Sequence, residues 1–219
     1  MIEVGNELQG RRIEWIVNGI PGTGEKPVIE KTYQVKRLLV VGGGPCVWND
    51  LSVLTDNGTR FDRFDHTMAV NDIGMYIPWE IHHWVSYHED LLNTWLEIRN
   101  NERMSRIYKR GKEHIELYAT RPLINKPYNW KVLGLMPHRG SSGLLAVLVG
   151  LILLYDEIIL AGIPLTRGNH HKAPWVDFNY EEERITVSWA LAIEHLFKGR
   201  VKSMSGRTRH WLGSPEIVV

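Results

Sequence analysis

The sequence predicts an α/β fold, with a mostly parallel sheet in one main domain and a small β appendage before it. Short aliphatic runs alternate with segments of helical periodicity from Lys36 onward, which is the pattern of a parallel sheet with right-handed crossovers. The first run, LLVV at 38–41, has no polar alternation and leads directly into three glycines and a proline. Such a run is typical of a central strand that is buried on both faces and ends in a sharp turn.

The other elements follow in chain order. Residues 1–35 form the appendage, in which segments 12–18 and 27–34 flank the turn-rich GIPGTGEK and predict a hairpin. In the main domain, 36–219, further strands are expected over 66–71, 82–87, 130–135, 157–161 and 201–204. Helices are expected over 47–55, 90–112, 142–154 and 181–197. The helix over 142–154 is apolar on nearly every side, so we expect it to be buried.

Length and composition narrow the class of protein. A chain of 219 residues is long enough for one domain with a sizeable core, and its formal net charge of +1 gives no field that would attract nucleic acid or an anionic membrane. Cys46 is the only cysteine, so no intramolecular disulfide forms. The start of the chain has no apolar h-region, and the longest apolar run, 144–155, is too short to span a bilayer. We therefore expect a cytoplasmic protein without a membrane span.

Polar groups follow four of the expected strands. They are Gly42, Gly43, Gly44 and Pro45 after the first, Asn71 and Asp72 after the second, His88 and Glu89 after the third, and Gly162 to Pro164 after the strand at 157–161. The carboxyl ends of parallel strands lie at one edge of the sheet, where α/β proteins bind ligands. Glycines there let a phosphate approach main-chain N–H groups. The pattern predicts a nucleotide site, with tight turns and a helix cap as the structural alternatives.

An anion site is also predicted at the start of the buried helix. Ser141 and Ser142 can cap that helix, and its free N–H groups attract anions. Arg139 would add a bidentate donor for a phosphate or carboxylate. The alternative is a plain helix cap with an arginine on the surface.

Histidines in the loop after 157–161 are the candidates for acid–base chemistry. His170 and His171 titrate near neutrality, so either can serve as a general base. No cysteine or carboxylate stands at ligand spacing beside them, so no metal site is predicted there. His82 and His83 lie in an expected strand, where alternation sends their rings to opposite faces. Cys46 has no activating base nearby in the sequence and is interpreted as a small turn residue.

Basic residues are dense between Arg99 and Lys126 and again from Lys198 onward. The first group interleaves with glutamates, as on a solvated helix face. The tail is more one-sided, so a polyanionic partner for it stays open as an alternative, whereas nucleic acid is otherwise not expected.

Three stretches together resemble two related groups of proteins. They are GSSGLLAVLVGLILLYDEIILAGIPL at 140–165, GGGPC at 42–46, and the strand end with Asn71 and Asp72. One group is the bacterial sialyltransferases with a single Rossmann-like domain. The other is the archaeal-type 6-hydroxymethyl-dihydropterin pyrophosphokinases and their uncharacterised relatives. The similarity covers roughly residues 36–165 and implies a Rossmann-like domain that binds a nucleotide.

The resemblance to the sialyltransferases also implies roles for single residues. By position, the glycine loop, Asn71, Ser141 and Ser142 bind the nucleotide, and either His170 or His171 is the general base. The chain departs from the shared pattern in three places: Cys46 replaces a serine, Leu154 replaces a glycine, and Pro164 replaces an acidic residue. In the pyrophosphokinases that acid helps to hold Mg²⁺, so its loss weakens this second resemblance.

These features predict a nucleotide-dependent transferase, most specifically a glycosyltransferase. It would move a sugar from a nucleoside mono- or diphosphate sugar to a hydroxyl acceptor, while Arg139 and main-chain donors stabilise the departing phosphate. Two alternatives stay open, a Mg²⁺-dependent (pyro)phosphotransferase and a non-catalytic nucleotide-binding protein. The expected partners are the donor, an acceptor that the sequence does not identify and, because relatives often oligomerise, a second copy of the chain.

Overall fold

The structure is a computed structural model that describes nine stretches of the chain. They are residues 6–8, 11–18, 28–32, 35–56, 63–101, 115–119, 130–132, 141–166 and 182–216. The chain divides into two compact units, Met1–Lys36 and Arg37–Val219. Each unit is described by itself below.

The first unit contains a three-stranded antiparallel sheet in the order β1-β2-β3. Its strands are β1 (Asn6–Leu8), β2 (Arg11–Asn18) and β3 (Val28–Thr32). The pairing of β2 with β3 is the predicted hairpin, and β1 adds a strand that the sequence did not predict.

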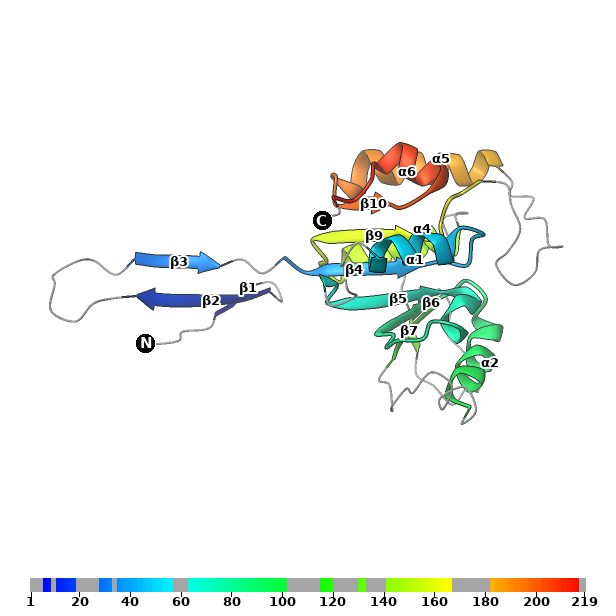
Figure 1. The fold of residues 1–219 in the computed structure, drawn as a ribbon, viewed down its shortest axis with the longest axis horizontal. Helices are drawn as coiled ribbons and strands as arrows, with labels where there is room; N and C mark the ends of the chain where they lie inside the picture. The colour runs from blue at the N-terminus through cyan, green and yellow to red at the C-terminus, as the bar shows by residue number, and fades with distance from the viewer. Residues whose placement is uncertain are drawn as a thin grey trace, which may run out of the picture. The chain divides into compact units, whose positions relative to one another are not determined.

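The second unit is built on a seven-stranded sheet in the order β10-β9-β4-β5-β6-β7-β8 (Figure 1). Its strands are β4 (Arg37–Val41), β5 (His66–Val70), β6 (His83–Val85), β7 (Glu116–Ala119), β8 (Trp130–Val132), β9 (Glu157–Ala161) and β10 (Val201–Ser203). Every neighbouring pair is parallel. The predicted Rossmann-like α/β class is therefore confirmed.

The order of the strands creates a switch point beside β4. From β4 the chain adds β5 to β8 on one side, and then returns to place β9 and β10 on the other side. In open α/β sheets, ligands bind outside the carboxyl ends of the strands at such a reversal. The strand order therefore directs attention to the carboxyl ends of β4 and β9.

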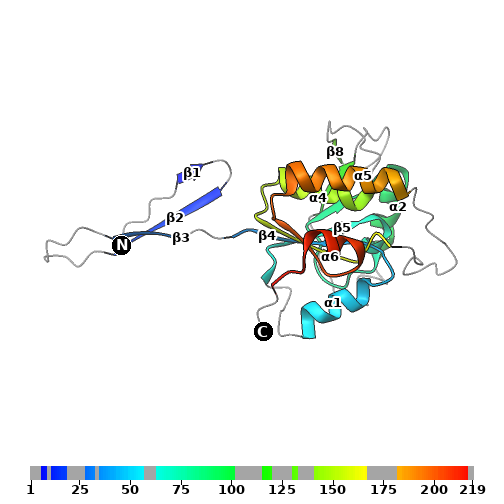
Figure 2. The same ribbon diagram turned by 90° about the horizontal axis from the view of Figure 1, so that it is seen from above.

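Helices cover both faces of this sheet. Figure 2 shows α4 (Ser142–Ile152) and α5 (Glu182–Ala192) on one side and α1 (Val47–Asp56) on the other. Buried residues of α2 (Glu89–Asn100) belong to the same cluster as those of α1. The last helix described is α6 (Gly206–Leu212). No helix in the described part of the chain is long and apolar enough to cross a membrane.

The alternation within β4 explains how one short strand supports two cores. Leu38 and Val40 belong to the cluster under α4, whereas Leu39 and Val41 belong to the cluster under α1. All four side chains are fully buried. The predicted buried helix is confirmed as well, because every residue of α4 from Ser142 to Gly150 is buried.

Several boundaries differ from the predictions. The helix expected over 90–112 is described only as far as Asn100. The helix expected over 181–197 becomes α5 followed by the π-helical turn η3 (Ile193–Phe197). Strand β6 is shorter than the predicted strand, and β7 and α6 were not predicted. The sequence of α6, GRTRHWL, is too rich in basic residues to show a wide apolar stripe.

Candidate functional site

The glycine turn at the end of β4 is hydrogen-bonded to the end of β9. The Gly42 N–H donates to the Ala161 carbonyl at 2.8 Å, and the Gly44 N–H donates to the Gly162 carbonyl at 2.8 Å. The turn therefore lies at the switch point, as the strand order requires. Because these two N–H groups already have carbonyl acceptors, a phosphate would have to bind through other donors.

Close packing explains why two of these glycines carry no side chain. A Cβ atom on Gly42 would lie 2.5 Å from Cγ1 of Ile163, and one on Gly44 would lie 2.6 Å from Cδ of Pro164. Gly43 is half-buried and Pro45 is exposed, so the outer part of the turn is the part that solvent reaches. The glycine pattern is thus needed for packing between β4 and β9, whether or not a ligand binds.

A buried carboxylate connects α1 with the ends of β9 and β10. Oδ2 of Asp50 accepts hydrogen bonds from the Gly162 N–H at 2.8 Å and from the Ser205 hydroxyl at 2.7 Å. Asp50 is only 6 % exposed. Gly162 adopts a φ of +67°, and a Cβ there would lie 2.2 Å from the Gly42 carbonyl oxygen. The Asp50 bonds and the close packing at Gly162 therefore fix α1 against the ends of β9 and β10 at the switch point.

Cys46 lies beside this carboxylate as an unreactive thiol. Its Sγ is 2.9 Å from the Ser205 hydroxyl oxygen. Burial, with a smaller contribution from the Asp50 charge, raises the pKa of Cys46 to about 11, and the Ser205 hydrogen bond only partly opposes these two effects. A thiol with this pKa is protonated at neutral pH and is a poor nucleophile. This supports the interpretation of Cys46 as a small turn residue.

Asn71 is held in a strained conformation directly after β5. Its φ is +57°, a region that non-glycine residues seldom adopt. The indole N–H of Trp84 donates to the main-chain carbonyl of Asn71 at 2.7 Å. The Ser86 hydroxyl donates to the side-chain Oδ1 of Asn71 at 2.8 Å. Ser86 in turn accepts from the N–H of His88 at 2.8 Å. These bonds fix the rotamer and the orientation of the Asn71 amide.

The start of α4 lies next to the end of β6. Ser141 is the predicted N-cap, and its Oγ accepts from the Leu144 N–H at 3.3 Å and from the indole N–H of Trp189 at 3.2 Å. Ser142 is 8 % exposed, and its Oγ accepts from the Tyr87 N–H at 3.4 Å. Burial raises the pKa of the Tyr87 phenol, so that group stays protonated.

The structure thus brings the predicted residues together in two groups. Gly42, Gly44 and Gly162 form one group at the β4–β9 junction. Asn71 and Ser142 form the other group. Two consecutive residues after β6 hold them: Ser86 donates to Asn71, and Tyr87 donates to Ser142. Asp72 is half-buried in the turn after β5. Arg139, His170 and His171 lie outside the described residues, as does the side chain of Glu89.

The residues that hold each group together were not predicted. Asp50, Ser86 and Ser205 act through contacts that the sequence does not display, since Asp50 is 112 residues from Gly162 and 155 residues from Ser205. A polar residue in the buried face of the helix after the glycine turn was the one available signal for Asp50.

The prediction for His82 and His83 needs correction. Strand β6 begins at His83, so strand alternation does not extend to His82. Instead of separating, both rings lie beside His66, with ring centroids 4.3 Å and 5.3 Å away. Within the described stretches there is still no group of three or more His, Cys, Asp or Glu side chains arranged to hold a metal ion.

Comparisons with protein-family models, with curated proteins and with solved structures give no match to this chain. The case for a function therefore rests on the sequence pattern and on the geometry of the carboxyl edge.

Proposed function

We propose that the protein is a nucleotide-dependent transferase, most specifically a glycosyltransferase. The donor would be a nucleoside mono- or diphosphate sugar, and the acceptor would be a hydroxyl group. The observation that carries the proposal is the meeting of Asn71 and Ser142 at the carboxyl edge of a parallel sheet with a switch point beside β4.

The start of α4 is the best-supported place for the phosphate. The helix has eleven residues and no acidic residue in its first turn, so the positive end of its dipole is not neutralised by the helix itself. Arg139 precedes the helix by three positions and would add a second donor. Since the N–H groups of Gly42 and Gly44 are already bonded, the glycine turn would shape the site more than it would hold the charge.

Asn71 would then recognise the nucleoside through a hydrogen bond. Its carbonyl Oδ1 is occupied by Ser86, which leaves the Nδ2 donor to face a ligand acceptor such as a base carbonyl or a ribose oxygen. A residue whose amide is oriented by neighbouring bonds loses little rotamer entropy when it binds. Strained backbone supports the same role, because such conformations gather at binding sites.

The transfer would require a base at the acceptor. A histidine from the segment that follows β9 in the sequence, His170 or His171, would take the proton of the acceptor hydroxyl. The acceptor oxygen bonds to the anomeric carbon as the bond from that carbon to the phosphate oxygen breaks. The electron pair leaves with the nucleotide, whose negative charge Arg139 and the α4 N–H groups would stabilise.

Replacing both His170 and His171 separates this role from donor binding. His170→Ala with His171→Ala should lower turnover by at least about a hundredfold, the usual contribution of a general base. The dissociation constant of the donor should change little, because neither histidine is assigned to the nucleotide. His195→Ala is the matched control, since its imidazole is exposed and near Glu194. Unchanged turnover in the double variant would remove the histidines from the mechanism.

The remaining functions are outcomes of the same assay. Activity that needs a nucleoside triphosphate together with Mg²⁺ would replace glycosyl transfer with (pyro)phosphoryl transfer. Donor binding without turnover for any acceptor tested would identify a non-catalytic nucleotide-binding protein.

A further inference from the structure

Helix α5 carries an exposed apolar stripe on its outer side. Val187 is 57 % exposed and Leu191 is 53 % exposed, which makes them the most exposed of the large apolar side chains that the structure describes. Ala190 lies between them and is exposed as well. On the opposite side of the helix, Trp189 and Ala192 are buried in the core under α4. The α5 stripe, which consists of Val187, Ala190 and Leu191, therefore faces away from the core.

The composition of α5 is unusual for a helix with one side in water. The nine residues from Ile185 to Ile193 include no Asp, Glu, Lys, Arg or His. The polar residues among them, Thr186 and Ser188, are half-buried. In α2, by contrast, the exposed Leu91 and Ile98 lie on a helix that carries acidic and basic residues along its length. A surface helix normally presents charged groups to solvent, so α5 has the composition of a helix that is covered on both sides.

Charged residues of opposite sign flank the α5 stripe. Position 184 of the helix is an arginine, and position 194, in η3, is a glutamate. The spacing of positions 184, 187, 191 and 194 is that of a coiled-coil seam, so they fall on one side of the helix. The carboxylate of Glu194 is exposed, with Nε2 of the exposed His195 3.7 Å away. The stripe is thus apolar in its middle, with a basic residue before it and an acidic residue after it.

This arrangement makes the α5 stripe complementary to itself. Positions 187 and 191 are equally far from position 189, and so are positions 184 and 194. An antiparallel pair of α5 helices with a two-fold axis at the level of position 189 would place Val187 against Leu191 of the partner subunit. The same pair would place the arginine at position 184 against Glu194 of the partner subunit, and each contact would occur twice. A parallel pair would instead bring like charges together at both ends.

We propose that two copies of this chain associate through α5 as an antiparallel helix pair. Burial of the α5 stripe of both copies drives the association, and the opposite charges at its ends set the direction. One helix from each copy is a small interface, so the dissociation constant should be on the order of micromolar. Trp189, which donates to Ser141 at the start of α4, lies on the opposite side of the helix. The proposal therefore does not depend on nucleotide binding.

Sedimentation velocity of the full chain tests whether the copies associate. Between about 1 and 100 μM at pH 7.5, the unaltered protein should change from mostly monomer to mostly dimer. Leu191→Glu places a charge in the seam and should leave the protein monomeric over the same range. Val53→Glu is the matched control, because it adds a carboxylate at an exposed apolar position of α1 and should keep the dimer. A monomeric unaltered protein at the highest concentration, or a dimeric Leu191→Glu variant, would overturn the proposal.

A charge exchange tests the direction of the pair without changing the apolar residues. Glu194→Arg should weaken the dimer about tenfold, because two arginines would then face each other at each end of the pair. Adding Arg184→Glu exchanges the two charges and should restore the affinity to within about twofold. Ten residues of one helix span about 15 Å, so this rescue would not come from a contact inside one copy. Glu97→Arg, at an exposed position of α2, is the control and should leave the dimer unchanged. Absence of rescue would exclude the antiparallel pair.

Other occupants of the α5 stripe would give different results. A chain that stays monomeric but sediments with phosphatidylglycerol vesicles, and loses this binding in Leu191→Glu, would assign the stripe to a lipid surface and overturn the proposal. A monomeric chain whose Leu191→Glu variant unfolds at lower urea concentration would show that the chain covers the stripe itself, which would also overturn it.

Discussion

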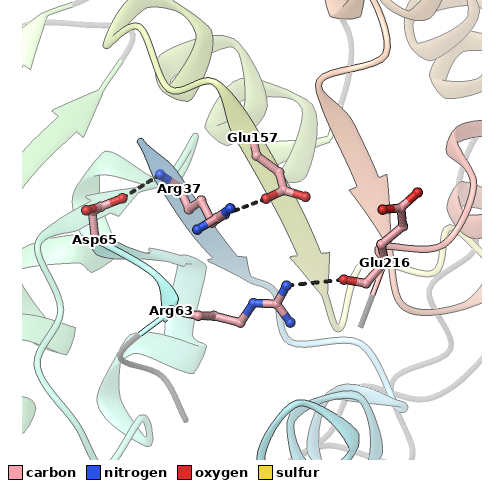
Figure 3. A network of polar contacts seen from close by, with 5 residues as sticks. All are labelled: Arg37, Arg63, Asp65, Glu157 and Glu216. Carbon is pink, nitrogen blue, oxygen red and sulfur yellow. Dashed lines mark hydrogen bonds and ion pairs between the residues drawn. The ribbon is translucent and has the colours of Figure 1, made fainter. Parts of the chain in front are cut away.

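The two edges of the main sheet are built from different kinds of interaction. At the amino edge, side chains bond to side chains, as in the Arg37–Glu157 ion pair and the contacts of Tyr155 with His66. At the carboxyl edge, most bonds reach main-chain groups, and the Asp50 carboxylate bonds to the N–H of Gly162. The amino edge is tied together mainly by pairs of side chains (Figure 3), whereas the carboxyl edge is shaped mainly by bonds to the backbone.

The distribution of strained backbone sharpens this contrast. Among the described residues, four non-glycine residues have a positive φ. Leu154 and Lys198 end helices, where a left-handed residue is ordinary. Asn71 and Leu165 instead follow β5 and β9 at the carboxyl edge. Strain that is not explained by a helix end is thus confined to the edge where we propose that the nucleotide binds.

The largest effect is expected from Gly162→Ala. The new Cβ would lie 2.2 Å from the Gly42 carbonyl oxygen, and alanine is unfavourable at φ +67°. We expect the free energy of unfolding to fall by about 3 kcal/mol or more. Gly199→Ala is the matched control: its φ is +76°, but no atom of the described residues lies within 4 Å of the new Cβ. It should cost about 1 kcal/mol. Equal losses in urea unfolding would show that packing at the switch point is unimportant.

Asp50→Ala should have the next largest effect. It leaves the buried N–H of Gly162 without an acceptor and removes the bond from Ser205. The cost should be about 2–3 kcal/mol in chemical unfolding, and Asp50→Asn, which keeps an oxygen acceptor, should cost about 1 kcal/mol. Asp65→Ala is an exposed comparison at the amino edge and should cost no more than about 1 kcal/mol. If Asp65→Ala proved the more costly, the assignment of Asp50 to the switch point would be wrong.

Glycine substitutions at the two strained positions, Asn71 and Leu165, should separate an effect on folding stability from an effect on nucleotide binding. Leu165→Gly relieves a left-handed φ of +49° but removes a partly buried side chain that packs against the core under α4, so the free energy of unfolding should fall by about 1 kcal/mol. Asn71→Gly should leave stability nearly unchanged, because it removes strain together with the hydrogen bond from Ser86. It should nevertheless weaken nucleotide binding by up to about tenfold, as loss of a good hydrogen bond does. If calorimetric titration found that Asn71→Gly binds the nucleotide with full affinity, the Asn71 amide would have no role in nucleoside recognition.

The smallest effect on stability at neutral pH is expected from Cys46→Ser. With its pKa raised to about 11 from 9.0 by burial, the thiol should react with iodoacetamide about a hundredfold more slowly at pH 7.5 than an exposed cysteine does. The raised pKa also means that Cys46 favours folding below about pH 9 and that this contribution is lost as the pH rises towards 11. Cys46→Ser should abolish that alkaline loss. Rapid alkylation at pH 7.5 would contradict the buried, protonated thiol.

The sequence predicts the parts of this molecule that depend on local patterns. Uninterrupted aliphatic runs identify β4 and β9, because a strand buried on both faces has no polar alternation. The N-cap at Ser141 follows from a serine before an apolar helix. Strand β7 was missed because it is four residues long and lies in a segment whose charges favoured a solvated helix.

The candidate site was predicted less completely, for a physical reason. The positions of Gly42, Asn71 and Gly162 follow from strand ends, which the sequence shows. Their partners Asp50, Ser86 and Trp84 depend on tertiary packing over long stretches of chain. The packing role of the glycine turn was also hidden, since it depends on Ile163 and Pro164 lying against it.

Nucleotide binding at the carboxyl edge can be measured by thermal shift against cytidine, uridine, guanosine and adenosine mono-, di- and triphosphates, with and without Mg²⁺. We predict that one nucleoside mono- or diphosphate raises the Tm without Mg²⁺. The shift should be lost in Asn71→Ala and Ser142→Ala and kept in Asn100→Ala, which removes an exposed asparagine of α2. A flat screen for the unaltered protein, or a shift that both site variants keep, would contradict the account.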